Sequence, residues 1–71
     1  MEKKNVKFCE HLTTLRKGCK MSQQDLALKI HVSQQCVSKW ERGLIEPTLT
    51  FLWRLADVFE ITLDELVGRK V

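Results

Sequence analysis

The sequence predicts an all-α fold, a compact five-helix bundle without strands. Apolar residues recur at three- and four-residue spacing along most of the chain, which is the period of an amphipathic helix and not the alternation of a strand. Serine or threonine precedes several of these segments, and glycine or proline follows them, as expected for helix starts and stops. The 71 residues suffice for one domain, so we expect a single domain over residues 1–71.

The first helix is predicted over residues 4–17. Its apolar stripe repeats every three or four residues and consists of Val6, Phe8, Cys9, Leu12 and Leu15. Gly18 follows the stripe and ends the helix. The outer face is rich in charge, so we expect it to face solvent.

The second and third helices are predicted over residues 23–30 and 34–42, separated by only three residues. Ser22 is the expected N-cap of the second helix. With Asp25 it forms a capping box in which aspartate replaces the usual, longer glutamate. Leu26, Ala27 and Ile30 are expected to face the core. Ser33 caps the third helix, and Gly43 supplies the left-handed residue that ends it.

The fourth helix is predicted over residues 49–59, because Pro47 prevents continuation of the third and Thr48 can start a new one. Its expected core stripe consists of Leu49, Leu52, Leu55, Ala56 and Phe59. A short fifth helix follows Thr62, which forms a full capping box with Glu65, and Gly68 ends it.

The third helix sorts its side chains onto two faces. At 100° per residue, Cys36, Val37 and Trp40 share the inner face. The opposite arc carries Gln34, Gln35, Ser38, Lys39 and Arg42. Every side chain on this arc can donate hydrogen bonds, which suits the major groove of DNA. Glutamine can pair with adenine, and lysine or arginine with guanine.

Residues 15–67 resemble the helix-turn-helix family of phage repressors and Cro proteins. The matching residues are Leu15-Arg16, Ser22-Gln23-Gln24, Leu26-Ala27, Ile30, Val32-Ser33, Val37-Ser38, Trp40-Glu41, Gly43, Pro47 and Leu63-Asp64-Glu65-Leu66. The resemblance implies that the third helix enters the major groove and that Ala27 lets the two motif helices approach closely.

The resemblance also assigns roles to individual residues. The expected base-contacting residues are Gln34, Gln35, Ser38 and Lys39. The expected phosphate-contacting residues are Gln23, Arg42, Ser22 and Lys20. Arg16 and Glu41 match a pair that commonly forms a salt bridge. The implied function is a transcriptional regulator, a repressor that binds a palindromic operator in double-stranded DNA as a homodimer.

Two positions depart from the family pattern. His31 stands where glycine is usual, at a turn that needs positive φ, so we expect strain of roughly 1 kcal/mol there. Cys36 replaces the more frequent threonine or serine, and burial on the inner face of the helix explains this change.

Charge and surplus apolar residues indicate the partners. Residues 1–42 carry nine Lys/Arg against four Asp/Glu, a net +5, whereas residues 43–71 carry three against five, a net −2. The cationic half contains the third helix and suits a polyanion. Phe51 and Trp53, together with Leu44 and Ile45, exceed what the core needs. Two interpretations are open, extra core under a loop and a subunit interface; we favour the interface and expect Phe51, Trp53 and Leu44 to form it.

Other functions have less support in the sequence. The three cysteines have no paired short spacing, so we expect neither a disulfide framework nor a metal site. No catalytic motif, cofactor motif or small-molecule site is evident, so we expect no enzyme. No apolar segment is long enough to cross a membrane, and the absence of a targeting signal indicates a cytoplasmic protein.

Two alternatives to a DNA-binding regulator remain open at this stage. One is an antitoxin-like module of the same fold, which would bind a partner protein through Phe51, Trp53 and Leu44. The other is a thiol-based redox switch at Cys19, which lies in the lysine-rich stretch RKGCK.

Overall fold

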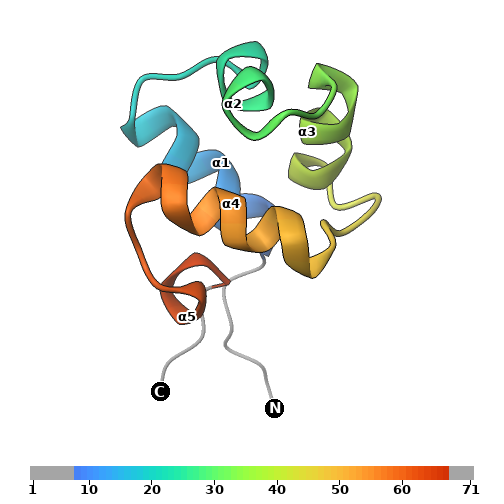
Figure 1. Cartoon of the computed structure of the whole chain (residues 1–71). Coiled ribbons are helices and arrows are strands. Elements are labelled where there is room, and N and C mark those ends of the chain that lie inside the picture. Colours follow the sequence, from blue (N-terminus) through green and yellow to red (C-terminus); the bar gives the residue numbers. More distant parts are fainter. Residues whose placement is uncertain (1–7, 68–71) are drawn as a thin grey trace.

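A computed structural model describes residues 8–67, and this part of the chain is all helical, as predicted. Five helices follow one another in Figure 1: α1 (Phe8–Gly18), α2 (Gln23–Ile30), α3 (Gln34–Glu41), α4 (Leu49–Phe59) and α5 (Leu63–Leu66). The predicted start of the first helix at Lys4, its residue Val6 and the stop at Gly68 lie outside the described residues.

The helices place the α2–α3 pair at one end of the molecule. In Figure 1, α2 and α3 lie together at the top, α4 crosses in front of α1, and α5 lies at the opposite end. The His11 ring connects α1 to α5, because its Nε2 donates to the backbone carbonyl of Glu65 at 2.7 Å. The α2–α3 pair is thus supported from below by α1 and α4.

Local side-chain caps set most of the helix starts. Ser22 and Asp25 form the predicted capping box at α2, and Thr62 and Glu65 form the one at α5. Ser33 Oγ accepts from the backbone N–H of Cys36 at 3.1 Å and caps α3. Thr48 stands at the N-cap of α4 but makes no side-chain cap bond. The third helix ends at Glu41, one residue before the predicted Arg42, which is its C-cap.

The core consists of ten buried apolar side chains drawn from all five helices: Leu12, Leu26, Ala27, Ile30, Val37, Trp40, Leu55, Ala56, Phe59 and Leu66. The predicted inner face of α2 is therefore confirmed. The assignment of Leu49 to the core was wrong, because its side chain is 55% exposed. Phe51 takes an inner place instead and packs against Trp40, with ring centroids 5.7 Å apart.

Four described residues have positive φ. His31 has φ 66° and ψ 48°, so the sequence-based prediction of a left-handed residue in the α2–α3 turn is confirmed. Gly43 has φ 76°, and a Cβ built there would lie 3.4 Å from Cys9 Sγ. Lys20 and Glu60 also have positive φ, 60° and 58°, and sequence analysis did not anticipate either.

Candidate nucleic-acid interface

The exposed face of α3 carries the predicted base-contacting residues. Gln34, Gln35 and Lys39 are exposed, and Ser38 is half-buried. The opposite face anchors the helix, since Val37 is 0% and Trp40 is 2% exposed. This helix therefore presents a row of hydrogen-bonding side chains on a rigid, well-packed support.

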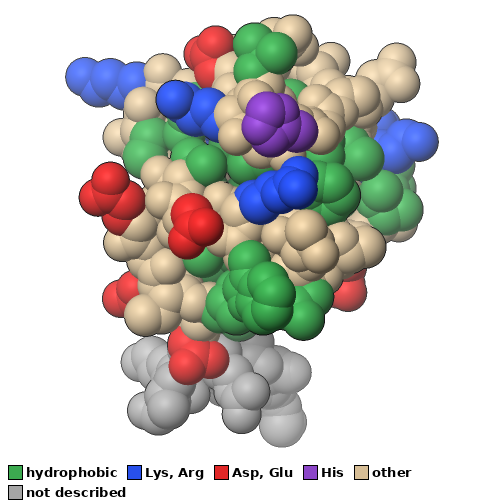
Figure 2. Space-filling view, in the orientation of Figure 1, with side chains coloured by type: hydrophobic (Ala, Val, Ile, Leu, Met, Phe, Trp, Pro, Cys, Tyr) green, Lys and Arg blue, Asp and Glu red, His purple; other side chains and the backbone are tan. Residues whose placement is uncertain are grey.

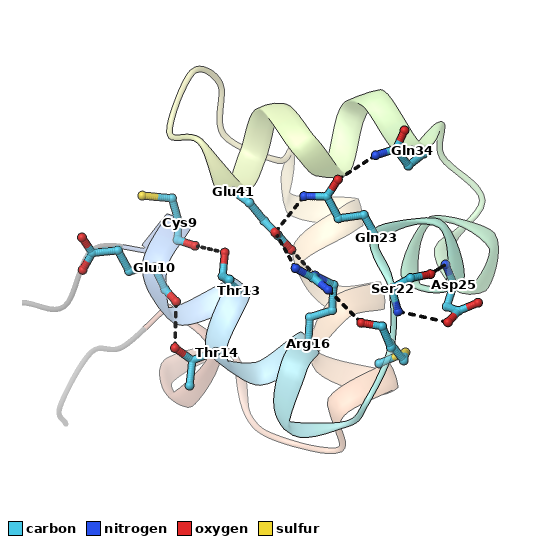
Figure 3. A network of polar contacts seen from close by, with 11 residues as sticks. Cys9, Glu10, Thr13, Thr14, Arg16, Ser22, Gln23, Asp25, Gln34 and Glu41 are labelled. Carbon is cyan, nitrogen blue, oxygen red and sulfur yellow. Dashed lines mark hydrogen bonds and ion pairs between the residues drawn. The ribbon is translucent and has the colours of Figure 1, made fainter.

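A salt bridge behind α3 ties it to α1. Arg16 Nε lies 2.6 Å from Glu41 Oε2, and Arg16 Nη2 donates to Glu41 Oε1 at 3.1 Å, so the pair is bidentate. Arg16 Nη1 also donates to the carbonyl of Met21 at 2.8 Å. The two side chains are only 11% and 6% exposed, so solvent screens the pair weakly. Figure 3 shows the two groups facing each other between the helices.

The surroundings keep both groups of this pair charged. Burial tends to raise the pKa of Glu41, but the hydrogen bonds from Arg16 and Gln23 and the charge of Arg16 outweigh burial and hold it below its ordinary value. The hydrogen bond to Glu41 raises the pKa of Arg16, against the opposing effect of burial. Glu41 is thus a carboxylate that can only accept hydrogen bonds.

Gln23 extends this network to the start of α3. Gln23 Nε2 donates to Glu41 Oε1 at 3.0 Å, and Gln34 Nε2 donates to Gln23 Oε1 at 2.6 Å (Figure 3). Sequence reasoning assigned Gln23 only to a phosphate and missed this bridge. The bond partners lie 18 and 11 residues away along the chain, so no local pattern signals them.

The other expected phosphate-contacting residues lie at helix ends: Lys20 and Ser22 before α2, and Arg42 at the C-cap of α3. Lys20, Ser22 and Arg42 are all exposed. The Ser22 hydroxyl accepts from the N–H of Asp25 at 2.9 Å, which leaves its hydrogen for a further acceptor. In return the backbone N–H of Ser22 donates to Asp25, and this bond is the main cause that lowers the Asp25 pKa.

Charge is unevenly distributed over the surface. Figure 2 shows one face, on which the basic side chains lie in the upper half, around α2, α3 and the upper side of α4. Most acidic side chains visible there lie lower, around α4 and α5. The end that carries the α2–α3 pair is therefore the more cationic one on this face.

Large apolar side chains remain exposed near the α3–α4 connection. The loop contributes Leu44 at 61% and Ile45 at 45% exposure, and α4 contributes Leu49 at 55% and Trp53 at 53%. We call these four residues the apolar patch. Of the three residues predicted for a dimer interface, Trp53 and Leu44 belong to it, whereas Phe51 is half-buried against the core.

The cysteines are dispersed over the described chain. Cys19 is exposed, Cys9 and Cys36 are half-buried, and all three are free thiols. Within residues 8–67, no three side chains of His, Cys, Asp or Glu are grouped closely enough to hold a metal ion. None of the described helices is long and apolar enough to cross a membrane.

Comparison with known proteins identifies the family. The helix-turn-helix family profile matches residues 12–66. The HTH-type transcriptional activator BcrR of Enterococcus faecalis is 37% identical over 63 residues, which are 89% of this chain and 31% of BcrR. The cryptic phage CTXphi transcriptional repressor RstR of Vibrio cholerae is 38% identical over 64 residues, 90% of this chain and 57% of RstR.

A solved structure matches the fold at nearly full length. The P22 c2 repressor, crystallised in complex with synthetic operator 9T, superposes with a TM-score of 0.85 and 28% identity, covering 92% of this chain and 98% of that one. The chain spans about a third of BcrR and just over half of RstR. The profile match, the two relatives and the shared fold agree, and the chain belongs to the helix-turn-helix family of phage repressors and Cro proteins.

Proposed function

We propose that this protein is a sequence-specific DNA-binding transcriptional regulator, a repressor that places α3 in the major groove of its operator. The observation that carries the proposal is the exposed row of donors on α3, held from behind by Val37 and Trp40. The family membership supports it, because the relatives are named transcriptional regulators and the P22 c2 repressor was crystallised with an operator.

The network behind α3 favours adenine as the base that Gln34 contacts. The Glu41 carboxylate can only accept hydrogen bonds, so Gln23 must point its Nε2 toward Glu41 and its Oε1 toward Gln34. Gln34 donates one N–H of its amide to Gln23, so its other N–H and its carbonyl oxygen remain available to a base. A single donor beside an acceptor matches N7 and N6 of adenine, whereas guanine presents two acceptors.

The remaining polar residues are assigned by their position. Gln35, Ser38 and Lys39 share the exposed side of α3 with Gln34 and are proposed as further base contacts. Arg42 at the C-cap, Lys20 and Ser22 before α2, and the second N–H of Gln23 are proposed to bind phosphates, which fix the position of α3 on the duplex.

A homodimer on a palindromic operator completes the proposal. The apolar patch offers a surface for a second copy, because its four side chains, each 45–61% exposed, would be removed from water in a dimer. In such a dimer the two α3 helices would address half-sites about one turn of DNA apart, about 34 Å.

Selection of bound sequences from a random duplex pool tests the proposal. We expect an enriched site with two inverted half-sites about one turn apart and an adenine in each half-site that Gln34→Ala no longer selects. Gln34→Ala is expected to cost about 1–3 kcal/mol on the selected site and little on random DNA. Equal losses on both DNAs would exclude Gln34 as a base contact, and an unenriched pool would exclude sequence-specific binding.

Arg42→Ala provides the contrasting variant. A phosphate contact adds affinity on every sequence, so this variant is expected to weaken operator and random DNA alike and to lower the salt dependence by about one phosphate. An unchanged salt slope would remove Arg42 from the proposed interface.

The apolar patch also supports a second candidate, an antitoxin-like module that binds another protein. Trp53 and Leu44 would then contact that partner instead of a second copy. Purification of the protein from its own cells distinguishes the two, since this candidate predicts a stoichiometric partner that Trp53→Glu releases. Recovery of the homodimer alone would reject it.

A further inference from the structure

Arg54 on α4 connects three elements of the molecule. Its Nη1 donates to the carbonyl of Ile30 at 3.1 Å, and its guanidinium carbon lies 5.3 Å from the centre of the Phe51 ring. Phe51 in turn packs against Trp40, with their planes tilted by 48°. The contacts therefore run from the last residue of α2, through α4, to the buried side of α3. We call Arg54, Phe51 and Trp40 the α4 clamp.

The C-terminus of α2 requires such a partner. The last four backbone carbonyls of a helix have no N–H partner within the helix and need one from outside it. Here the Ala27 carbonyl accepts from the N–H groups of His31 and Val32. The Ile30 carbonyl accepts instead from Arg54, whose positive charge also interacts favourably with the negative end of the helix dipole. This bond is made one residue before His31, where the chain adopts the left-handed conformation.

The other half of the clamp acts on α3. Trp40 is 2% exposed and is the largest side chain that anchors α3. An aromatic pair at this distance and tilt is favourable, and the Arg54 guanidinium over the Phe51 ring adds a cation–π interaction. The same side chain thus fixes the end of α2 and the aromatic support of α3, the two elements joined by the strained turn.

We propose that Arg54 is a positioning residue that sets the angle of α3 and thereby the DNA sequence specificity, without touching DNA. The inference rests on the proposed function. Base contacts are short and directional, so they depend on the angle at which α3 enters the groove. Phosphate contacts are largely electrostatic and tolerate a small rotation. Loss of the clamp should therefore reduce specific binding more than non-specific binding.

DNA binding by Arg54→Met and Arg54→Lys tests this inference. Methionine keeps the apolar stem without donor or charge, and lysine keeps the charge without the planar group. On the selected operator we expect about a tenfold loss for Arg54→Met and a smaller loss for Arg54→Lys. On random DNA we expect less than a twofold change for either variant, with an unchanged salt slope. Lys29→Met, an exposed cation on α2 outside the clamp, serves as the matched control.

Two results would overturn the proposal. A salt slope lowered by about one phosphate in Arg54→Met would make Arg54 a direct DNA contact. An equal loss on operator and random DNA, with the unfolding midpoint lowered, would make it a purely structural residue. Phe51→Leu gives an independent check, because it should reproduce the specificity loss and add little to it in the double variant.

Amide hydrogen exchange separates this proposal from the proposed function. The N–H groups of His31 and Val32, both bound to the Ala27 carbonyl, are expected to exchange faster in Arg54→Met, while α5 amides keep their rates. If the wild-type protein selects no DNA sequence, the proposed function fails while the exchange result still tests the clamp. Unchanged exchange at the turn would overturn the clamp itself.

Discussion

His31 adopts a backbone conformation that favours glycine. Its φ of 66° and ψ of 48° place it in the left-handed region, where a side chain costs about 1 kcal/mol. The side chain is exposed, and no hydrogen bond to it is found in residues 8–67. We expect His31→Gly to raise the thermal midpoint by about 4–8 °C, measured by circular dichroism.

Glu60→Gly is the matched control for this prediction. Glu60 is also an exposed C-cap with positive φ, at the end of α4 and away from α3. Both variants should be more stable if backbone strain is the cause. A lower midpoint for His31→Gly with a higher one for Glu60→Gly would show that the His31 imidazole has a stabilising role of its own.

Glu41 makes stability depend on pH in the acid range. Its pKa in the folded protein lies below the ordinary value of 4.5, so the folded state binds the proton more weakly than the unfolded state. The stabilisation is therefore complete above about pH 4.5 and is lost as the pH falls through the folded pKa. We expect Glu41→Gln to lower the free energy of unfolding by about 2 kcal/mol at pH 7 and by less at pH 3. Urea unfolding at both pH values measures the difference.

An exposed carboxylate outside the network controls for general charge effects. Glu10→Gln on α1 should leave the pH dependence of the wild-type protein nearly unchanged. If the free energy of unfolding of Glu41→Gln falls between pH 7 and pH 3 as much as that of the wild-type protein, Arg16 and Glu41 do not act as a charged pair in solution.

Residue-level prediction failed where neighbours decide burial. Helical spacing placed Leu49 in the expected core stripe of α4 and left Phe51 outside it. The structure covers Phe51 with Trp40 and Arg54 and leaves Leu49 exposed. In the same way, the network through Gln23 depends on the packing of α1, α2 and α3, which no short sequence pattern contains.

At the scale of elements, helix existence and bounds followed closely from the sequence. The bounds of α2 and α4 match the prediction, and α3 differs by one residue. The signals are local: a capping side chain bonds to a backbone N–H three residues later, as Ser22, Ser33 and Thr62 do. The sorting of α3 into a buried and an exposed face is also local, because it needs only the helical period.

Ser33 and Thr48 provide a test of capping. Ser33→Ala removes the hydroxyl that accepts from the Cys36 N–H, so we expect a loss of about 1 kcal/mol in unfolding free energy. Thr48→Ala removes no cap bond and should change stability by only a few tenths of a kcal/mol. Chemical denaturation of both variants measures the difference, and equal losses would contradict the assignment of Ser33 as the α3 cap.

At the scale of the whole molecule, the apolar patch predicts self-association. Trp53→Glu places a charge in the patch without disturbing the core, since Trp53 is 53% exposed. We expect sedimentation analysis to show a dimer for the wild-type protein and a monomer for Trp53→Glu, with weaker operator binding. Leu28→Glu on α2, where Leu28 is 65% exposed outside the patch, should remain dimeric. A wild-type protein that stays monomeric at all concentrations would refute this interface.

The separation of the two faces of α3 also has an evolutionary consequence. Gln35 and Lys39 contribute nothing to the core, while Val37 and Trp40 hold the helix in place. Descendants of this protein can therefore exchange the outward residues and acquire a different target without repacking the interior. Gln34 is less free to vary, because its amide completes the chain of bonds that begins at Arg16. We therefore expect divergent paralogues to change Gln35 and Lys39 before Gln34.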